Sequence, residues 1–369
     1  MRYKQFKGHD VSTLGLGGLR FPTAPSDPNT IDRIEGQKVV DTAISCGINC
    51  FDTAHSYQNE DSERFLGEAL SKYPRDSYYL STKFYVEYSD DIEATFEAQL
   101  KRCQTDYFDF YMLHCLDENT ITAYMDKKHD YLGYLLRQKE KGRIRNIGFS
   151  SHAAPETLKR FLDWHDQFDM ALIQLNYLDW IMLEARRQYE ILVEHGIPVW
   201  VMEPMKGGSL STLNKEAAAV LKAVAPKRSL SSWGFQFLQG LSEVQVVLSG
   251  MSTVSQVMEN AAIFDACNPL NNQERAALSR AAAIFMETMG VPCTSCRYCC
   301  SACPADLDIP LLIKGYNEQK ISGSTWKIAN LSEAKSPTTC LSCGSCVKRC
   351  PQKIDIPQVM KRFSMEMEV

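Results

Sequence analysis

The sequence lacks any long apolar run, and its first residues contain no apolar segment. Residues 1–10 read MRYKQFKGHD, and no uninterrupted stretch of about 18 apolar residues, the length that a membrane span requires, occurs anywhere in the chain. These absences argue against a secretory signal and against a transmembrane helix. We therefore predict a cytoplasmic protein.

An excess of basic charge is also absent. The chain has 40 Lys and Arg against 45 Asp and Glu, for a formal net charge of -5. Nucleic acids and anionic membranes attract basic surfaces, so the sequence predicts neither a nucleic acid nor a membrane as a partner. Hydrophobic residues at 44% and charged residues at 23% are typical of a globular protein with a buried core.

Short apolar, β-branched runs alternate with amphipathic stretches over the first 290 residues. This alternation is typical of parallel strands joined by crossover helices, such as those expected over 91–103 and 155–164. Eight such units favour a closed (β/α)8 TIM barrel over residues 1–290, with the Pro-rich segment 21–30 as a loop on its catalytic rim. The strands are expected at 14–17, 48–52, 78–82, 108–113, 144–149, 171–175, 198–202 and 244–248.

Composition changes near Val291, where we place the start of a second domain, 291–369. Nine of the 14 cysteines lie between residues 293 and 350. They form an internal repeat, because the pattern that starts at Cys293 recurs 47 positions later at Cys340. Two copies of one pattern predict two equivalent sites.

Each copy reads C-x2-C-x2-C-x3-C-P, the run that holds a [4Fe-4S] cluster in bacterial ferredoxins. A pair of structural zinc sites with four cysteines each is the alternative, since C-x2-C pairs also suit tetrahedral zinc. The resemblance to two-cluster ferredoxins implies that the fourth cysteine of each run ligates the other cluster. One cluster would then be held by Cys293, Cys296, Cys299 and Cys350, and the second by Cys340, Cys343, Cys346 and Cys303.

Polar side chains follow three successive strands of the expected barrel. Asp52 and Tyr57 come after the second strand, Lys83 after the third and His114 after the fourth. Barrel enzymes place their chemistry at these strand ends, so we expect the four side chains to converge. Tyr normally holds its proton to about pH 10, and a nearby ammonium held by a carboxylate would let it act as a general acid near neutral pH. A rim residue without a catalytic role is the alternative for each one taken singly.

These residues lie in motifs that resemble the aldo-keto reductase family across about residues 1–290. The resemblance implies an extended nicotinamide coenzyme, NADH or NADPH, and a catalytic tetrad of Asp52, Tyr57, Lys83 and His114. The tail resembles the branch of the family that carries a fused dicluster domain. The motifs are LGLGG at 14–18, FDTAHSY at 51–57, STK at 81–83, DYFDFYMLH at 106–114, IGFSSH at 147–152, IQLNY at 173–177 and SGMSTVSQVMEN at 249–260.

The same resemblance implies a set of coenzyme-binding residues. Ser150 and Gln174 would bind the carboxamide, and the loop 205–209 would cover the pyrophosphate. A tight strand-to-loop turn is the alternative reading of the LGLGG motif. The remaining positions of this set are Gly17, Gly18, Met202, Met205, Lys206, Gly207, Gly250, Met251, Ser252, Gln256, Glu259 and Asn260.

Three positions depart from the family pattern. Met202 replaces a Tyr that stacks on the nicotinamide, and Ser151 replaces an Asn beside Ser150. Gln256 replaces the Arg that pairs with the adenosine 2′-phosphate, and a neutral amide cannot form that charge-assisted pair. We predict that NADH is used comparably to or better than NADPH, with Lys206 as a second route to phosphate binding.

The sequence thus predicts reduction of aldehydes or ketones to alcohols, with a small carbonyl compound as substrate. The alternative is an iron-sulfur electron-transfer protein, in which the clusters relay electrons for a redox partner protein and the barrel binds a partner or cofactor. Hydride carries two electrons whereas each cluster passes one, so direct exchange between them is awkward without a flavin. Substrate choice would depend on rim loops, with Tyr85, Tyr88 and Trp180 as candidate aromatic walls.

Overall fold

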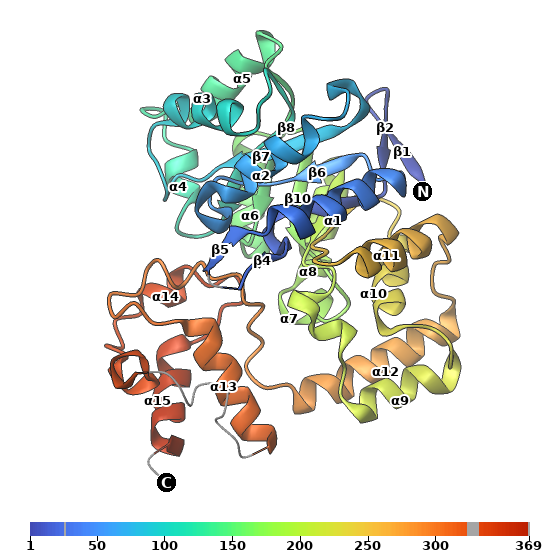
Figure 1. Ribbon diagram of the computed structural model, residues 1–369, viewed down its shortest axis with the longest axis vertical. Coiled ribbons are helices and arrows are strands. Elements are labelled where there is room, and N and C mark those ends of the chain that lie inside the picture. Colours follow the sequence, from blue (N-terminus) through green and yellow to red (C-terminus); the bar gives the residue numbers. More distant parts are fainter. Residues whose placement is uncertain (26, 323–331, 368–369) are drawn as a thin grey trace. The chain divides into compact units, whose positions relative to one another are not determined.

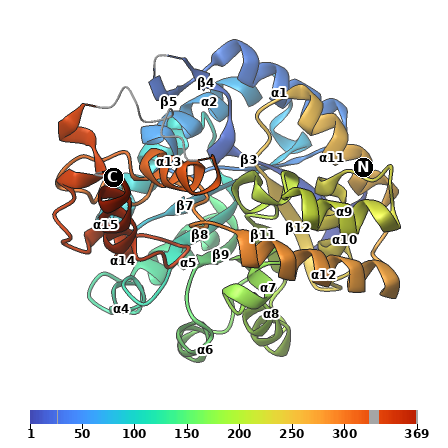
Figure 2. The same cartoon turned by 90° about the horizontal axis from the view of Figure 1, so that it is seen from below.

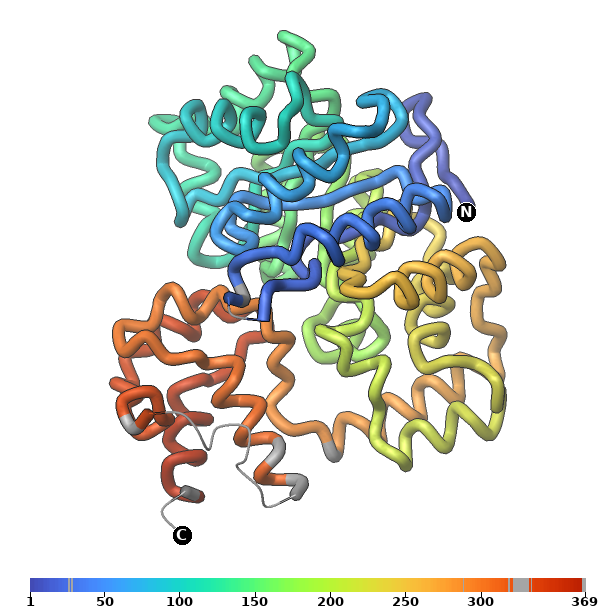
Figure 3. Tube along the Cα trace, in the orientation of Figure 1, coloured from blue at the N-terminus to red at the C-terminus, as the bar shows by residue number. Residues whose placement is uncertain are grey.

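The computed structural model describes residues 1–25, 27–322 and 332–367. The chain divides into two compact units, which are traced in Figure 3. The first unit contains Met1–Met205 and Ala225–Leu278, and the second contains Lys206–Val224 and Ser279–Val369. A segment in the middle of the sequence therefore groups with the cysteine-rich tail.

The first unit is a closed barrel of parallel strands (Figure 1). Its strands follow one another around the ring in sequence order, and the last pairs with the first through Val247 and Leu14. The expected eight-stranded barrel is confirmed. The strands are β3 (Leu14–Gly17), β6 (Cys50–Asp52), β7 (Tyr79–Phe84), β8 (Phe108–Leu116), β9 (Ile144–Ser151), β10 (Met170–Gln174), β11 (Val199–Met202) and β12 (Val244–Ser249).

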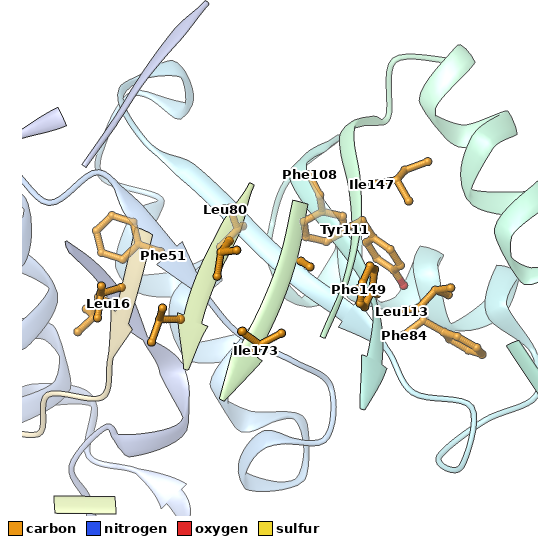
Figure 4. Close-up of a cluster of buried hydrophobic side chains, with 14 of the residues drawn as sticks. Leu16, Phe51, Leu80, Phe84, Phe108, Tyr111, Leu113, Ile147, Phe149 and Ile173 are labelled. Carbon is orange, nitrogen blue, oxygen red and sulfur yellow. The ribbon is translucent and has the colours of Figure 1, made fainter. Parts of the chain in front are cut away.

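The strands are buried on both faces, as the runs of apolar residues in the sequence require. All nine residues of β8 are buried. The side chains of β8 contribute to two cores. Phe110 and Met112 pack with Trp200, whereas Phe108, Tyr111 and Leu113 belong to the larger cluster drawn in Figure 4.

Helices in the first unit alternate with the strands. In Figure 2, α1 and α11 lie side by side where the ring closes. Asp32 and Asp91 cap α1 and α3 by accepting bonds from backbone N–H groups of the first turn, which fixes where these helices begin. The helices are α1 (Arg33–Ser45), α2 (Asp61–Leu70), α3 (Ile92–Arg102), α4 (Ile121–Tyr124), α5 (Tyr131–Glu140), α6 (Pro155–Trp164), α7 (Asp179–Met182), α8 (Ala185–Glu194), α10 (Leu230–Gln239) and α11 (Val254–Ala266).

Two short hairpins complete the first unit. The strands β1 (Tyr3–Phe6) and β2 (His9–Ser12) form one, and Phe6 packs against Phe110 near the start of β8, with ring centroids 5.3 Å apart. The strands β4 (Thr23–Ala24) and β5 (Asp27–Ile31) form the other. The segment 21–30, predicted as a loop after the first barrel strand, falls largely in this second hairpin, because its backbone pairs with itself.

The second unit is helical. Its core is formed by apolar residues from two helices, among them Leu312, Ile313, Met360 and Phe363, together with three buried cysteines. No helix in the described part of the chain is long and apolar enough to cross a membrane. Its helices are α9 (Lys215–Val224), the latter part of α12 (Asn272–Thr288), α13 (Ile309–Ser322), α14 (Ser345–Lys348) and α15 (Ile356–Met367).

Candidate active site

The four predicted catalytic residues lie at the carboxyl ends of three neighbouring strands. Asp52 is the last residue of β6, and Tyr57 begins the short 3-10 helix η2 (Tyr57–Glu60) that follows it. Lys83 and His114 lie inside the ends of β7 and β8 rather than after them, because both strands continue further than the apolar runs suggested. All four side chains are buried.

Lys83 forms a buried ion pair with Asp52. The Lys83 ammonium donates at 2.7 Å to both carboxylate oxygens of Asp52 and at 2.7 Å to the carbonyl oxygen of Thr53. Ser81 donates a further bond to the Asp52 carboxylate. These three bonds use all three protons of the ammonium, so its position is fixed. A buried charge of this kind is stable only when it is paired in this way.

Tyr57 lies between this ammonium and His114. The Lys83 nitrogen is 5.1 Å from the centre of the Tyr57 ring, and the rings of Tyr57 and His114 are 6.0 Å apart. Burial, reinforced by the positive charge of Lys83, lowers the pKa of His114 well below its usual value. The imidazole is therefore neutral near pH 7, with one nitrogen that donates and one that accepts.

The chain after Tyr57 has an unusual backbone. Gln58, Asn59 and Glu60 have φ values of 43°, 50° and 69°, a left-handed conformation that is costly for residues other than glycine. Side-chain bonds hold it: Gln58 donates at 2.6 Å to the carbonyl of Leu19, and Glu60 pairs with Arg64 at 2.7 Å. This turn fixes where Tyr57 lies relative to β6.

A buried polar network supports Lys83 from α2 and α3. Gln99 donates at 2.9 Å to the backbone carbonyl of Lys83 and at 2.8 Å to Glu63. Glu63 also accepts from Thr82 at 2.6 Å and pairs with Arg102 at 2.6 Å. The sequence analysis missed this network, because its members show no pattern until the two helices pack on β7.

Aromatic rings surround His114. Tyr85 lies 5.3 Å from the His114 ring and stacks with Tyr88, so two of the three candidate walls lie near the tetrad. Trp180 instead packs against Tyr189 and Phe237. His55, which the sequence analysis missed, lies 5.3 Å from Tyr88, and burial lowers its pKa to about 4.

The predicted carboxamide-binding residues are buried at the ends of β9 and β10. Ser150 accepts a bond at 2.9 Å from the backbone N–H of Cys115. Gln174 donates at 2.8 Å to Asp179, which orients its amide. Ser151 accepts from the N–H of Ala153 at 3.1 Å. An amide with one side fixed in this way fits a hydrogen-bonded ring substituent.

Gly17, the last residue of β3, and Gly18, which follows it, differ in the space around them. A side chain on Gly18 would lie 2.6 Å from the Ser62 hydroxyl and 2.8 Å from the carbonyl oxygen of Asp52, so the fold itself requires glycine there. Gly17 meets only ordinary contacts with Ser249 and Gly250. This favours the structural alternative for Gly18.

Other predicted positions follow β11 and β12. Met202 is half-buried, and Met205 packs on α10, where a side chain on Gly234 would collide with it. Met251 is buried, Glu259 is exposed, and Asn260 donates at 3.4 Å to Ser249.

Gln256 caps its own helix. Its side-chain oxygen accepts from the backbone N–H groups of Ser252 at 2.7 Å and Thr253 at 3.2 Å, completing a capping box. Near it lies Arg20, a cation that the sequence analysis missed. A side chain on Gly250 would collide with Arg20, whose guanidinium is 3.8 Å from Glu203 and whose carbonyl accepts from Ser252 at 2.6 Å.

Lys206 and Gly207 fall in the second unit, within the 3-10 segment η4 (Lys206–Ser211). The Lys206 ammonium is buried and donates at 3.0 Å to the side-chain oxygen of Gln352. A side chain on Gly207 would lie 2.8 Å from the backbone of Thr294. Both partners belong to the cysteine-rich region.

The eight predicted cluster ligands line two pockets of the second unit. Cys293, Cys296, Cys299 and Cys350 line one, together with Thr294 and Gln352 among other residues. The second pocket contains the other four ligands, Cys303, Cys340, Cys343 and Cys346. Each pocket thus takes three cysteines from one copy of the repeat and one from the other.

The spacing of these thiols bears on the zinc alternative. Thiolates around one zinc ion, with bonds of about 2.3 Å, must nearly touch one another. Among the described residues, no group of three His, Cys, Asp or Glu side chains lies close enough to share a single ion. Pockets lined by four separated thiols suit a larger cluster. Cys300 lines neither pocket and is half-buried.

Comparison with known families identifies both domains of the chain. The model of the aldo/keto reductase family matches residues 13–283. This chain belongs to the aldo/keto reductase family. The model of the 4Fe-4S dicluster domain matches residues 292–354, so the reductase domain is followed by a dicluster ferredoxin domain.

Individual relatives are distant. A probable aldo-keto reductase of Glycine max is 28% identical over 55% of this chain and 58% of its own length. The NADH-specific methylglyoxal reductase of Escherichia coli (strain K12) is 26% identical over 54% of this chain and 66% of its own length. The structure of aldo-keto reductase AKR11C1 from Bacillus halodurans matches with 26% identity and a TM-score of 0.62. The match covers 76% of this chain and 96% of the Bacillus halodurans chain.

Proposed function

We propose that this protein reduces small aldehydes or ketones to alcohols with a nicotinamide coenzyme. The observation that carries the proposal is the buried Lys83–Asp52 pair beside Tyr57 and His114. A fixed ammonium next to a phenol stabilises the phenolate that remains when the proton leaves. Members of the family to which the chain belongs are oxidoreductases, which agrees with this chemistry.

The side chains divide the work between them. When bound, NAD(P)H supplies a hydride to the carbonyl carbon. Tyr57 gives its hydroxyl proton to the carbonyl oxygen, which completes the alcohol, and Lys83 stabilises the phenolate. Asp52 keeps Lys83 in place, and neutral His114 orients the carbonyl oxygen by a hydrogen bond. The stacked rings of Tyr85 and Tyr88 form an apolar wall beside His114.

The coenzyme would be held by the predicted positions at the ends of β3, β9, β10, β11 and β12. Gln174 and Ser150 suit its carboxamide, and Arg20 adds a cation next to Gly250. Gln256 offers no positive charge to a 2′-phosphate and is already engaged in its helix cap. This supports the preference for NADH, as does the NADH specificity in the name of the Escherichia coli relative.

We assign one [4Fe-4S] cluster to Cys293, Cys296, Cys299 and Cys350, and the other to Cys303, Cys340, Cys343 and Cys346. The composition of the two pockets supports this crossed assignment. In the proposed reduction the clusters hold the tail together. The cytoplasmic localisation stays a prediction from the sequence.

The decisive experiment replaces the proton donor. Tyr57→Phe should lower kcat for aldehyde reduction by NADH by about 100-fold to 10,000-fold, the usual contribution of a general acid, with cluster content unchanged. Tyr134→Phe is the matched control, since it removes a buried hydroxyl that has no hydrogen-bond partner among the described residues. Unchanged turnover in Tyr57→Phe would refute the mechanism.

A second candidate function is electron transfer through the clusters, and the exposure of the second pocket favours it. Cys343 is exposed, and Leu341 beside it is 66% exposed, so a redox partner protein could reach a cluster there. Reduction of the clusters by NADH, seen by electron paramagnetic resonance in the absence of a carbonyl, would support this role. Clusters that stay oxidised while aldehyde is consumed would favour carbonyl reduction alone.

A further inference from the structure

The two cysteine-lined pockets of the second unit are built from equivalent positions of the repeat. The first pocket is that of Cys293, and the second is that of Cys340. Each residue besides cysteine that lines the first pocket has a counterpart, 47 positions away in the sequence, that lines the second. The apolar counterparts are Pro310 and Pro357, Ile313 and Met360, Ile354 and Leu307, and Ile356 and Ile309.

The remaining three positions differ in polarity. Thr294, Arg297 and Gln352 line the first pocket, whereas the residues at the same positions of the second are Leu341, Gly344 and Ala305. Besides the cysteines, Arg297 is the only residue with an ionisable side chain among the described residues that line either pocket. The first pocket is therefore polar and contains a cation, and the second is apolar.

The backbones of the two copies match as closely as their linings. Ser295 and Ser342 have φ values of 56° and 51°, and Arg297 and Gly344 have values of 67° and 75°. This left-handed conformation is easy for glycine and costly for arginine. The second copy has the residue that suits the backbone, and the first does not. The backbone thus gives no reason for an arginine at position 297, which indicates a role for its side chain.

Arg297 also changes the charge around the first pocket. Its guanidinium donates at 3.1 Å to both carboxylate oxygens of Asp308, which accepts at 3.3 Å from the backbone N–H of Leu311 in the first turn of α13. The counterpart of Asp308 is Asp355, which accepts at 3.2 Å from the N–H of Gln358. Asp355 has no ion-pair partner in the part of the chain that the structure describes. At these positions the first copy is neutral, and the second carries a negative charge.

We infer that Arg297 raises the reduction potential of the cluster in the first pocket above that of the cluster in the second. This inference rests on the proposed assignment of the two clusters. A cluster gains one negative charge when it accepts an electron, and a cation beside it stabilises the reduced state. An electron given to the second cluster by a low-potential one-electron donor then passes to the first, which is reduced as the second is oxidised again.

Solvent acts in the opposite direction. Water also stabilises a reduced cluster, and Cys343 is exposed whereas its counterpart Cys296 is half-buried. Only one of the four thiols of the second pocket is exposed, so the charge of Arg297 should outweigh this effect. The Arg297 side chain is itself 43% exposed, and solvent screens part of its charge. We expect the equilibrium constant for reduction to be about tenfold larger for the first cluster, which corresponds to about 59 mV for a one-electron couple.

A redox titration of the full-length protein, followed by electron paramagnetic resonance, tests the inference. The unaltered protein should be reduced in two steps. Arg297→Gly introduces the residue of the second copy and leaves Asp308 without its cation, so it should lower the equilibrium constant of the first step about tenfold and bring the two steps together. Arg297→Lys keeps the charge and should keep the steps apart. A first step that does not shift in Arg297→Gly would overturn the inference.

A matched control removes a positive charge elsewhere in the second unit. Arg280, an exposed residue of α12, lines neither pocket, and Arg280→Gln should leave both steps in place. A shift as large as that of Arg297→Gly would contradict the inference, because net charge would then set the potentials. Iron analysis accompanies each titration. Zinc, or iron for fewer than two clusters in the unaltered protein, would instead refute the proposed cluster assignment.

Discussion

The candidate active site of the barrel and the cysteine-lined pockets achieve order in different ways. In the barrel, protein groups alone complete the arrangement, because the Lys83 ammonium has three acceptors and the Asp52 carboxylate has a donor in Ser81 besides Lys83. In the second unit, Cys299, Cys346 and Cys350 are themselves part of the apolar core. The barrel should therefore be preorganised without a cofactor, whereas the tail should depend on its clusters for folding.

Removing the iron should produce the largest difference between the two regions. Chelation under reducing conditions should make the backbone amides of α13 and α15 exchange quickly with solvent. The reason is that eight thiols would remain around two empty pockets. The strands of the barrel should stay protected. Hydrogen exchange read by mass spectrometry measures both in one sample, and protection retained in α13 and α15 would break the comparison.

Breaking the buried pair should have the next largest effect, confined to the barrel. Lys83→Met leaves the Asp52 carboxylate buried without its cation, and it should lower the free energy of unfolding by about 3–5 kcal/mol as well as abolish aldehyde reduction. The double variant Asp52→Asn/Lys83→Met should recover much of the stability but none of the activity. Denaturant titration and turnover separate the two roles, and recovery of activity would show that the pair is only structural.

Acid should destabilise the barrel through His55. Its folded pKa of about 4 lies below the unfolded value of 6.5, so the unfolded state binds more protons below pH 6.5. The contribution of neutral His55 to the free energy of unfolding is fully present above pH 6.5, and it is lost as the pH falls towards 4. Lowering the pH from 7 to 5 should remove about 2 kcal/mol through this residue.

The variant His55→Gln isolates that effect. It should lose less stability than the unaltered protein over the same pH range, as measured by urea titrations followed by tryptophan fluorescence. His114, whose pKa is also lowered by burial, stays in both proteins and accounts for the acid sensitivity that remains. An identical pH dependence in the two proteins would show that His55 does not titrate on unfolding.

The smallest effect concerns the choice of coenzyme. NADH should be used comparably to or better than NADPH, and a preference for NADPH above about 100-fold, worth roughly 2.7 kcal/mol, would contradict the interpretation of Gln256. Gln256→Arg should shift the ratio of kcat/KM towards NADPH by about tenfold, because a guanidinium pairs with phosphate. Gln256→Glu is the control, because it keeps the capping oxygen without adding a positive charge. It should not shift the ratio of kcat/KM towards NADPH.

Much of the first unit could be predicted because its signals are local. Each predicted strand overlaps an observed one, with ends that differ by up to three residues, as with 108–113 and Phe108–Leu116. Apolar runs and their spacing are properties of consecutive residues. The β4–β5 hairpin was missed because its segment contains three prolines and has little apolar pattern.

The sequence by itself determined the barrel and the repeated cysteine runs, since each strand and each run is encoded in residues a few positions apart. Only the tertiary structure decided that Arg20 lies against Gly250, that Gln99 supports Lys83, and that Lys206 bonds to Gln352, 146 positions away. The physical reason is that such contacts depend on how distant elements pack, and packing gives no signal in the local pattern of either partner.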